Sequence, residues 1–321
     1  MSTFTKWNKL PSELREHSLS YCKTRELGQY AQLTHLCNDE IQHLNTIAPK
    51  NLTITELKNS TNGIVISVQY PSANYYLYLH FMATSENTHK LFRSSFTYYP
   101  VLSNELLKNE PIFEGNARQT AFTYLEKLLR YTAQTKIEKL FINCEEWPYE
   151  LKGIPKIFKT SEWFVHMYPS MYDTFMSFMN ETINVKDMYL HTKSMEQNIM
   201  TLPAHFFKST FFKQLECAEF AMKAMISDED FLSSEAKLLK LKCDTISENA
   251  INRKIQKWCA TETALQLKIE LEHNRRFDID VIRQNMPFED NRFEKCLEIR
   301  RQDGKVGYLR IDKNVLMFGV D

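Results

Sequence analysis

Hydrophobic residues between positions 10 and 48 recur at the spacing of short helices. Leu27, Tyr30 and Ala31 stand at i, i+3 and i+4, and Thr24 just before them can serve as an N-cap. Similar apolar stripes lie before and after this segment. The pattern predicts a small N-terminal module of three short helices.

The period changes after this module, where apolar and polar residues begin to alternate. Ile64–Val68 and Tyr75–Leu79 are rich in β-branched and aromatic residues, which favour strands. An Asn-Gly pair precedes the first run, and Pro71–Asn74 separates the two runs as a turn would. Residues 52–99 are therefore predicted to contain a small antiparallel sheet.

From Ala117 onward, helical stripes alternate with short strand-like segments. The first stripe consists of Phe122, Leu125, Leu128 and Leu129. The strand-like segments share an apolar–x–apolar ending after polar residues, and they lie at 137–142, 185–190, 212–217, 236–241 and 264–269. This order predicts a series of βα units.

The spacing of these units is that of a repeat. After Leu190 the strand-like segments lie about 25 positions apart, within the range of leucine-rich repeats. The interval from Leu140 to Leu190 is about twice as long, which indicates a degenerate or skipped unit. A leucine-rich-repeat-like stack and a set of unrelated βα units both fit this pattern.

Two serines mark helix starts in this region. Ser227 opens a Ser-Asp-Glu-Asp segment that resembles a capping box. Ser247 can cap a helix that carries Ile251, Ile255 and Trp258 on one face.

The C-terminal segment predicts antiparallel strands. Cys296–Arg300 and Val306–Ile311 flank Gln302–Lys305, whose Asp-Gly pair suits a type I′ hairpin turn. Val315–Val320 is predicted to be a last strand. Such a cap would protect the terminal edge of a repeat stack.

The composition is that of an ordinary globular protein, with 43% hydrophobic and 25% charged residues in 321. Lys plus Arg equals Asp plus Glu at 40 each, so the net charge gives no reason to propose nucleic acid or a membrane as a partner. The seven cysteines include no C-x-x-C pair, and we expect reduced thiols in the cytoplasm or nucleus. No apolar run has the length of a signal peptide or a membrane span, so the chain is expected to be soluble.

Candidate chemistry is sparse. No nucleophile elbow, phosphate loop or dinucleotide fingerprint occurs. His35 and Cys37 are too close for an ordinary metal-ligand pair, and the adjacent Glu145 and Glu146 would point to opposite sides of a strand. We therefore expect no enzyme activity and predict no catalytic, cofactor-binding or metal-binding residue.

Two further groups of residues have alternative interpretations. The aromatic and Met-rich segments 163–168 and 171–179 can form core between two units or an adaptable binding patch. The pairs Arg275-Arg276 and Arg300-Arg301 are expected in solvated turns rather than in phosphate clamps.

The N-terminal segment resembles an F-box. Leu10-Pro11-Ser-Glu13-Leu14 is similar to the Leu-Pro-x-Glu-Leu start of that family, and an apolar helix and a second helix follow it. Ser18 and Cys22 stand where the family usually has larger aliphatic residues. The resemblance implies docking on a Skp-type adaptor through Leu10, Pro11, Glu13, Leu14, Leu19, Leu27 and Leu36.

The C-terminal part resembles the F-box-associated domains of the nematode-expanded F-box families. The similarity rests on a helix that bears Trp258 and on the late Arg301-Gln-Asp-Gly304 hairpin, within residues 240–321. By this resemblance, the C-terminal body captures a protein substrate.

Together these features predict a mixed α+β or α/β chain with three parts. These are an F-box-like helical module at 7–48, a β-rich connecting region at 49–115, and a leucine-rich-repeat-like body at 116–321 closed by a hairpin. The expected function is substrate recognition in a cullin–RING (SCF-type) ubiquitin ligase. The alternatives are a ligase-independent interaction scaffold with a degenerate F-box and, with no sequence feature in its favour, an unrecognised enzyme.

Overall fold

The computed structural model describes ten segments of the chain, which divide into two compact units. The segments are 51–57, 63–69, 76–96, 111–130, 137–154, 160–181, 185–192, 200–271, 275–291 and 296–320. The first unit comprises residues 1–144 and 148–161, and the second comprises 145–147 and 162–321. The predicted F-box module and its seven adaptor-binding residues lie outside the described segments.

The first unit contains the predicted antiparallel sheet. Its strands are β1 (Asn51–Leu57), β2 (Gly63–Gln69), β3 (Tyr76–Ser85), β4 (Thr88–Phe96), β5 (Ile112–Glu114) and β6 (Lys139–Asn143). Strands β1 to β5 pair antiparallel in chain order, whereas β6 pairs with β1 in parallel. The expectation of antiparallel strands between 52 and 99 is therefore confirmed.

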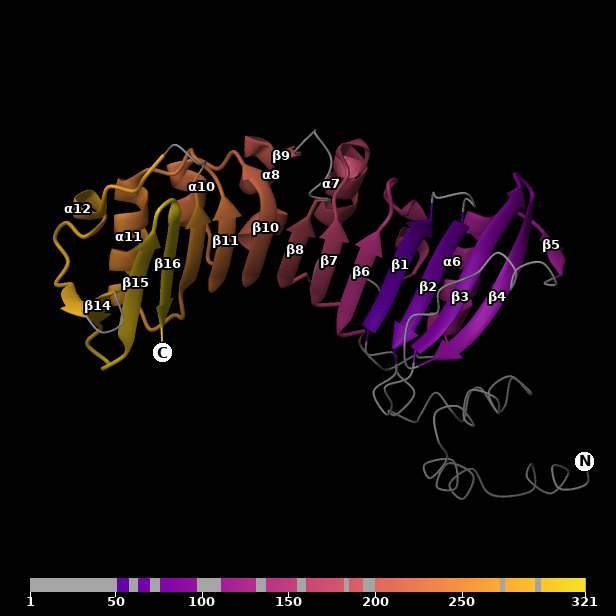
Figure 1. Ribbon diagram of the computed structural model, residues 1–321, viewed down its shortest axis with the longest axis horizontal. Coiled ribbons are helices and arrows are strands. Elements are labelled where there is room, and N and C mark those ends of the chain that lie inside the picture. Colours follow the sequence, from indigo (N-terminus) through magenta and orange to yellow (C-terminus); the bar gives the residue numbers. More distant parts are fainter. Residues whose placement is uncertain are drawn as a thin grey trace, which may run out of the picture. The chain divides into compact units, whose positions relative to one another are not determined.

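Helix α6 (Ala117–Arg130) covers one face of this sheet by packing against β2 and β3 (Figure 1). Phe122, Leu125 and Leu129 of its predicted stripe are buried. A 3₁₀ turn, η2 (Tyr149–Gly153), follows β6. The predicted boundary at residue 115 does not match the boundary between the units, because α6 and β6 join the antiparallel strands in one core.

The second unit is built around parallel strands. These are β7 (Glu162–His166), β8 (Asp187–His191), β10 (Cys217–Ala224), β11 (Leu238–Lys242) and β12 (Gln266–Glu270). They pair in chain order, and the short β9 (Thr201–Leu202) pairs with β10. The chain is thus mixed α/β, as predicted.

Two details of the predicted strands change. Strand β7 occupies the long interval between Leu140 and Leu190, where the sequence indicated a degenerate or skipped unit, and it contains the aromatic residues Trp163 and Phe164. The segment 212–217 was wrongly predicted to be a strand, because Thr210–Lys213 is helical and β10 begins only at Cys217. Buried Phe211 and Phe212 give this helical turn the apolar content of a strand.

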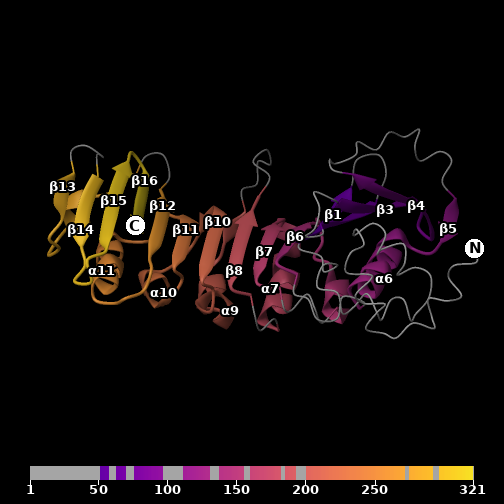
Figure 2. The same ribbon diagram turned by 90° about the horizontal axis from the view of Figure 1, so that it is seen from below.

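Helices connect the parallel strands and lie on one side of the sheet (Figure 2). They are α7 (Tyr172–Asn180), α8 (Ala204–Lys208), α9 (Thr210–Lys213), α10 (Asp228–Ser233) and α11 (Glu248–Cys259), with a 3₁₀ turn η4 (Pro169–Met171) before α7. The two predicted helix caps are confirmed. The Ser227 hydroxyl accepts a hydrogen bond from the backbone N–H of Asp230, and the Ser247 hydroxyl accepts one from the backbone N–H of Ala250.

An antiparallel group ends the second unit. After α12 (Ile279–Ile282) come β13 (Glu289–Asn291), β14 (Cys296–Arg300), β15 (Val306–Asp312) and β16 (Val315–Val320). Strand β16 pairs antiparallel with β12 and therefore covers the edge of the last parallel strand, as predicted. No helix in the described segments is long and apolar enough to cross a membrane.

The hairpin turn between β14 and β15 differs in type from the prediction. The Gly304 N–H donates to the Arg301 carbonyl, and Gly304 has a φ of 87°. Asp303 lacks the positive φ that a type I′ turn requires at both central residues. The turn is a longer loop in which glycine alone adopts the left-handed conformation.

Gly307 in β15 lies against two buried aromatic rings. A Cβ at this position would lie 2.6 Å from Cζ of Phe318 and 3.0 Å from Cη2 of Trp258, and both rings are buried. Gly307→Ala should lower the free energy of unfolding by about 1–3 kcal/mol through overpacking. Gly319→Ala in β16 is the matched control because its Cβ would meet no atom within 4 Å. Urea unfolding of the two variants measures the difference, and equal stabilities would contradict this packing.

The first unit should be sensitive to acid through His80 of β3. This side chain is 1% exposed, and burial lowers its pKa from 6.5 to about 4. The unfolded chain then binds more protons than the folded chain between these values, so stability falls as the pH falls. Between pH 7 and 5 the wild type should lose on the order of 1–2 kcal/mol more than His80→Leu. Chemical unfolding at both pH values tests this, and identical losses in the two proteins would refute it.

Candidate protein-binding surface

The parallel strands of the second unit alternate between a buried and an open face. The residues that face the helices are buried, and those between them are partly or fully exposed. We call the second set the open face, because no helix of the described segments covers it. It consists of Glu162, Phe164, His166, Asp187, Tyr189, His191, Cys217, Glu219, Ala221, Lys223, Leu238, Lys240, Lys242, Gln266, Lys268 and Glu270.

An aromatic pair lies at the β7–β8 end of the open face. Phe164 and Tyr189 are register partners, and their rings stack with centroids 4.3 Å apart at an interplanar angle of 4°. Burial raises the pKa of Tyr189 to about 12, with nearby acidic groups contributing, so its hydroxyl stays neutral. The pair forms a flat, amphipathic area of the kind enriched in protein interfaces.

Charged residues continue the same cross-strand row. Glu219 on β10 pairs with Lys240 on β11 at 2.7 Å, and Lys240 has Lys268 as its register partner on β12. Met317 on β16 lies next to Lys268, and Arg310 on β15 lies next to Met317. The row therefore changes from aromatic to cationic across seven strands, from β7 to β15, with the acidic Glu219 between the two ends.

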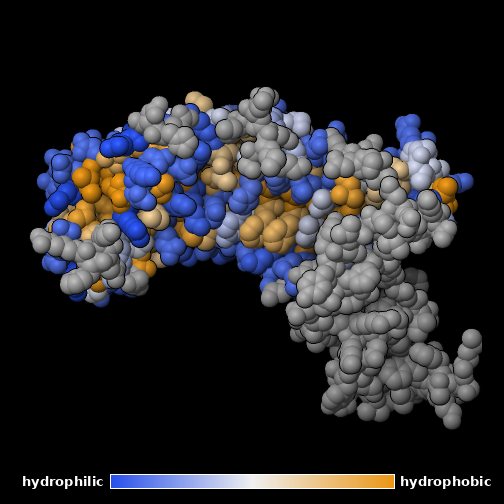
Figure 3. All heavy atoms as spheres, viewed as in Figure 1, coloured by the Kyte–Doolittle hydropathy of each residue, from blue (hydrophilic) through white to orange (hydrophobic). Residues whose placement is uncertain are grey.

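Figure 3 shows the same side of the second unit, where hydrophobic residues over β15 and β16 are flanked by hydrophilic ones. The neighbouring row contains longer ion pairs, with Lys242 3.6 Å from Glu270 and Lys223 3.6 Å from Asp244. Exposed pairs of this kind contribute little to stability. Their arrangement favours a role in recognition, where charge sets specificity and the rate of association.

The thiol on the open face is not arranged as a nucleophile. Burial, followed by a hydrogen bond to Asp187, raises the pKa of Cys217 to about 11. Burial likewise raises the pKa of Cys144 and of Cys243 to about 12. Since the thiolate is the reactive form, these residues support packing rather than catalysis.

The cationic end of the unit is held together by a clasp that consists of Trp258, Arg301 and Asp303. The Arg301 guanidinium lies 5.0 Å from the centroid of the Trp258 ring, forms an ion pair with Asp303, and donates to the carbonyls of Thr261 and Thr263. This ion pair lowers the pKa of Asp303 to about 2. The clasp joins the C-terminal end of α11 to the β14–β15 turn.

This clasp corrects one prediction. Arg301 was expected in a solvated turn, but it is 6% exposed because carbonyl groups and an aromatic face surround its guanidinium. Arg275 is half-buried and donates to the carbonyls of Asp244 and Ile246. The neighbouring Arg276 and Arg300 are exposed, as predicted.

The aromatic segments form core for the most part, which is one of the two interpretations that the sequence allowed, and Phe164 lies at the surface. In β7, Trp163 is fully buried whereas Phe164 lies on the open face. In α7, Phe175, Phe178 and Met179 are buried. The period-two pattern inside 162–166 was the signal that could have identified Phe164 as a surface residue.

Among the described residues, no group of three or more His, Cys, Asp or Glu side chains could hold a metal ion. The seven residues predicted to bind an adaptor, Leu10 to Leu36, are not among those described. What the structure brings together is a one-sided sheet with aromatic and charged residues, an arrangement suited to binding another chain.

Comparison with known proteins adds no relative. No family model matches the chain, and neither the curated proteins nor the solved structures contain a match.

The clasp predicts a clear difference between two adjacent arginines. Arg301→Met should lower the midpoint of thermal unfolding, because it removes an ion pair and leaves the carbonyls of Thr261 and Thr263 without their donor. Arg300→Met, at an exposed position, should leave the midpoint close to that of the wild type. Differential scanning fluorimetry compares them, and a midpoint for Arg301→Met equal to that of Arg300→Met would show that the clasp does not stabilise the unit.

Proposed function

We propose that the protein is a substrate-recognition subunit of a cullin–RING (SCF-type) ubiquitin ligase. In this proposal, the N-terminal segment binds a Skp-type adaptor and the second unit captures a protein substrate. The observation that carries the second half is the open face, a parallel sheet that the described helices cover on one side only. The first half rests on the Leu10-Pro11-Ser-Glu13-Leu14 motif.

The second unit further supports a leucine-rich-repeat-like architecture. Most parallel sheets carry helices on both faces, whereas leucine-rich repeats line one open surface with strands. The register partners Trp163, Met188, Ala218, Leu239 and Leu267 are 25, 30, 21 and 28 positions apart. These intervals are uneven but centre on the length of such a repeat.

The open face is suited to a protein rather than to a small molecule. It is an extended sheet surface whose side chains come from five neighbouring strands. Aromatic residues at one end and cations at the other can contact a chain laid across the strands. Hot spots of protein interfaces are enriched in such aromatic and cationic side chains.

Affinity purification from cells, scoring adaptor, cullin and other bound proteins, tests both halves at once. Leu10→Ala with Pro11→Ala should abolish recovery of the adaptor and the cullin but preserve the substrate. Tyr189→Ala with Lys268→Glu should have the opposite effect, because it disrupts the open face alone. Lys208→Glu, an exposed lysine on helix α8, is the control and should change neither.

The outcomes separate the proposal from its alternatives. If the purified wild type does not bind a Skp-type adaptor at micromolar concentration, ligase membership is refuted. Recovery of other proteins without adaptor or cullin would identify an interaction scaffold with a degenerate F-box. If the open-face variant retains every bound protein, substrate recognition does not occur on that face.

A further inference from the structure

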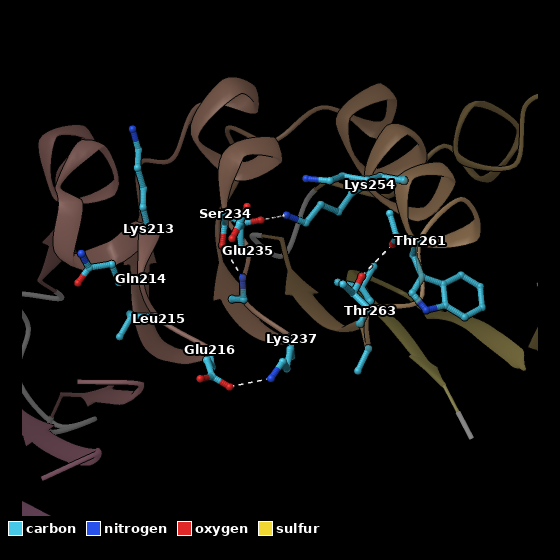
Figure 4. A pocket seen from close by; sticks show the side chains of 15 residues that line it. Lys213, Gln214, Leu215, Glu216, Ser234, Glu235, Lys237, Lys254, Thr261 and Thr263 are labelled. Atoms are coloured by element: carbon cyan, nitrogen blue, oxygen red, sulfur yellow. Dashed lines mark hydrogen bonds and ion pairs between the residues drawn. The ribbon is translucent and has the colours of Figure 1, made fainter. Parts of the chain in front are cut away.

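An open cavity of about 520 Å³, lined in part by lysines, lies in the second unit at the amino-terminal ends of β10, β11 and β12 (Figure 4). The turns 213–216, 234–237 and 261–265, each of which leads from a helix into a strand, form its walls together with α11. The cavity involves none of the open-face residues. Its volume is in the range of sites that hold small ligands.

Lys254 of α11 contributes a buried cation to this cavity. The side chain is 5% exposed, and its ammonium donates to the carbonyl of Phe231 at 3.0 Å and to that of Ser234, as the dashed line in Figure 4 shows. These carbonyls lie at the C-terminal end of α10, where a cation interacts favourably with the helix dipole. These two carbonyls accept from two of the three N–H groups of the Lys254 ammonium, which leaves one N–H group for a ligand.

Stabilising the end of a six-residue helix does not by itself require a buried charge, since water or a neutral donor can satisfy the same carbonyls. Burying an ammonium without an anionic partner is unfavourable, and no carboxylate forms an ion pair with Lys254 within the described segments. Burial, with the nearby Lys257 adding repulsion and Glu235 partly opposing both, lowers the pKa of Lys254 to about 8. An anion in the cavity would remove this penalty.

The remaining charges around the cavity are also mainly positive. Lys213, Lys237 and Lys257 line it together with Lys254, against Glu216 and Glu235. Glu216 is already engaged, because its carboxylate pairs with Lys186 and with Lys237. Only Glu235 is left to balance three lysines.

Neutral donors lie beside these lysines. The indole N–H of Trp258, a residue that lines the cavity, is buried and has no hydrogen-bond acceptor among the described residues. The hydroxyls of Thr261 and Thr263 are 2.8 Å apart at the cavity wall. Lysines and neutral donors among the residues that line one cavity favour a negatively charged ligand with several acceptor oxygens.

We propose that this cavity binds a phosphate monoester, with the phosphate group held by Lys254 and Lys257. The ligand can be a free metabolite or a phosphorylated side chain, since the phosphate group is common to both. The site is separate from the proposed ligase function and does not depend on it.

Isothermal titration calorimetry of the full chain tests the proposal with four probes: inorganic phosphate, O-phospho-L-serine, a short phosphoserine peptide and its unphosphorylated form. We expect saturable binding of at least one phosphorylated probe with Kd below about 1 mM, and none of the unphosphorylated peptide. Tighter binding of the phosphoserine peptide than of O-phospho-L-serine would identify a phosphorylated protein as the ligand. Equal affinity for the two probes would identify a small phosphorylated metabolite. Absence of binding by all phosphorylated probes at about 10 mM overturns the proposal.

Variants locate the binding. Lys254→Met and Lys257→Glu should each weaken it by at least about tenfold, the loss expected for one charge-assisted contact. Lys208→Glu removes an exposed lysine of helix α8 that does not line the cavity and should leave the affinity unchanged. If Lys254→Met does not fold, as judged by circular dichroism, the exposed Lys257→Glu decides the question alone. Binding that is unchanged in Lys257→Glu would place the anion elsewhere and refute the assignment.

Discussion

One constraint organises the second unit: the parallel strands bury only one of their two faces. Alternate residues such as Trp163, Met188 and Leu239 are fully buried beneath the helices, while their neighbours remain accessible. A parallel sheet covered on both faces would have near-continuous hydrophobic strands, and these strands are not continuous. The one-sided pattern therefore places all stabilising burial on the helical side and leaves the other side available for recognition.

The buried face of the sheet, on the side of the helices, is packed mainly with aromatic residues. Phe206, Phe207, Phe212 and Phe220 form a contiguous cluster with ring centroids 5.1–6.2 Å apart. Short helices such as α8 and α9 have little intrinsic stability, so they depend on tertiary packing of this kind. Large rings allow a five-residue helix to bury enough apolar area to close one repeat-like unit.

Much of this organisation could be predicted from local sequence, because the responsible interactions are local. Ser227 and Ser247 bond backbone groups three positions away, and the alternating pattern of β11 or β12 is contained within five residues. The strand predicted at 212–217 was wrong because apolar residues in a one-turn helix and in a strand cannot be separated by periodicity over so few positions.

Contacts between residues far apart in the chain could not be predicted from local sequence patterns. The clasp joins Arg301 to carbonyls 38 and 40 positions earlier, and nothing around Arg300-Arg301 indicates which arginine turns inward. The stacking of Phe164 on Tyr189 likewise depends on the register between β7 and β8. The cavity is a further case, because its three turns meet only when β10, β11 and β12 pair in parallel.

The two candidate sites are separated by the same geometry. Open-face side chains project from strands whose backbones are hydrogen-bonded to neighbouring strands of the sheet. The cavity is instead formed where helices turn into strands, and its central charge belongs to a side chain that also stabilises α10. Occupancy of the cavity would therefore act first on the packing of α10 against α11. Strands β10 and β11 flank α10 in the chain and carry Glu219 and Lys240 on the open face. A ligand in the cavity can thus influence the open face through the α10–α11 contact and through the lining turns that lead directly into β10, β11 and β12. Lys254 is one residue where stability and binding are coupled.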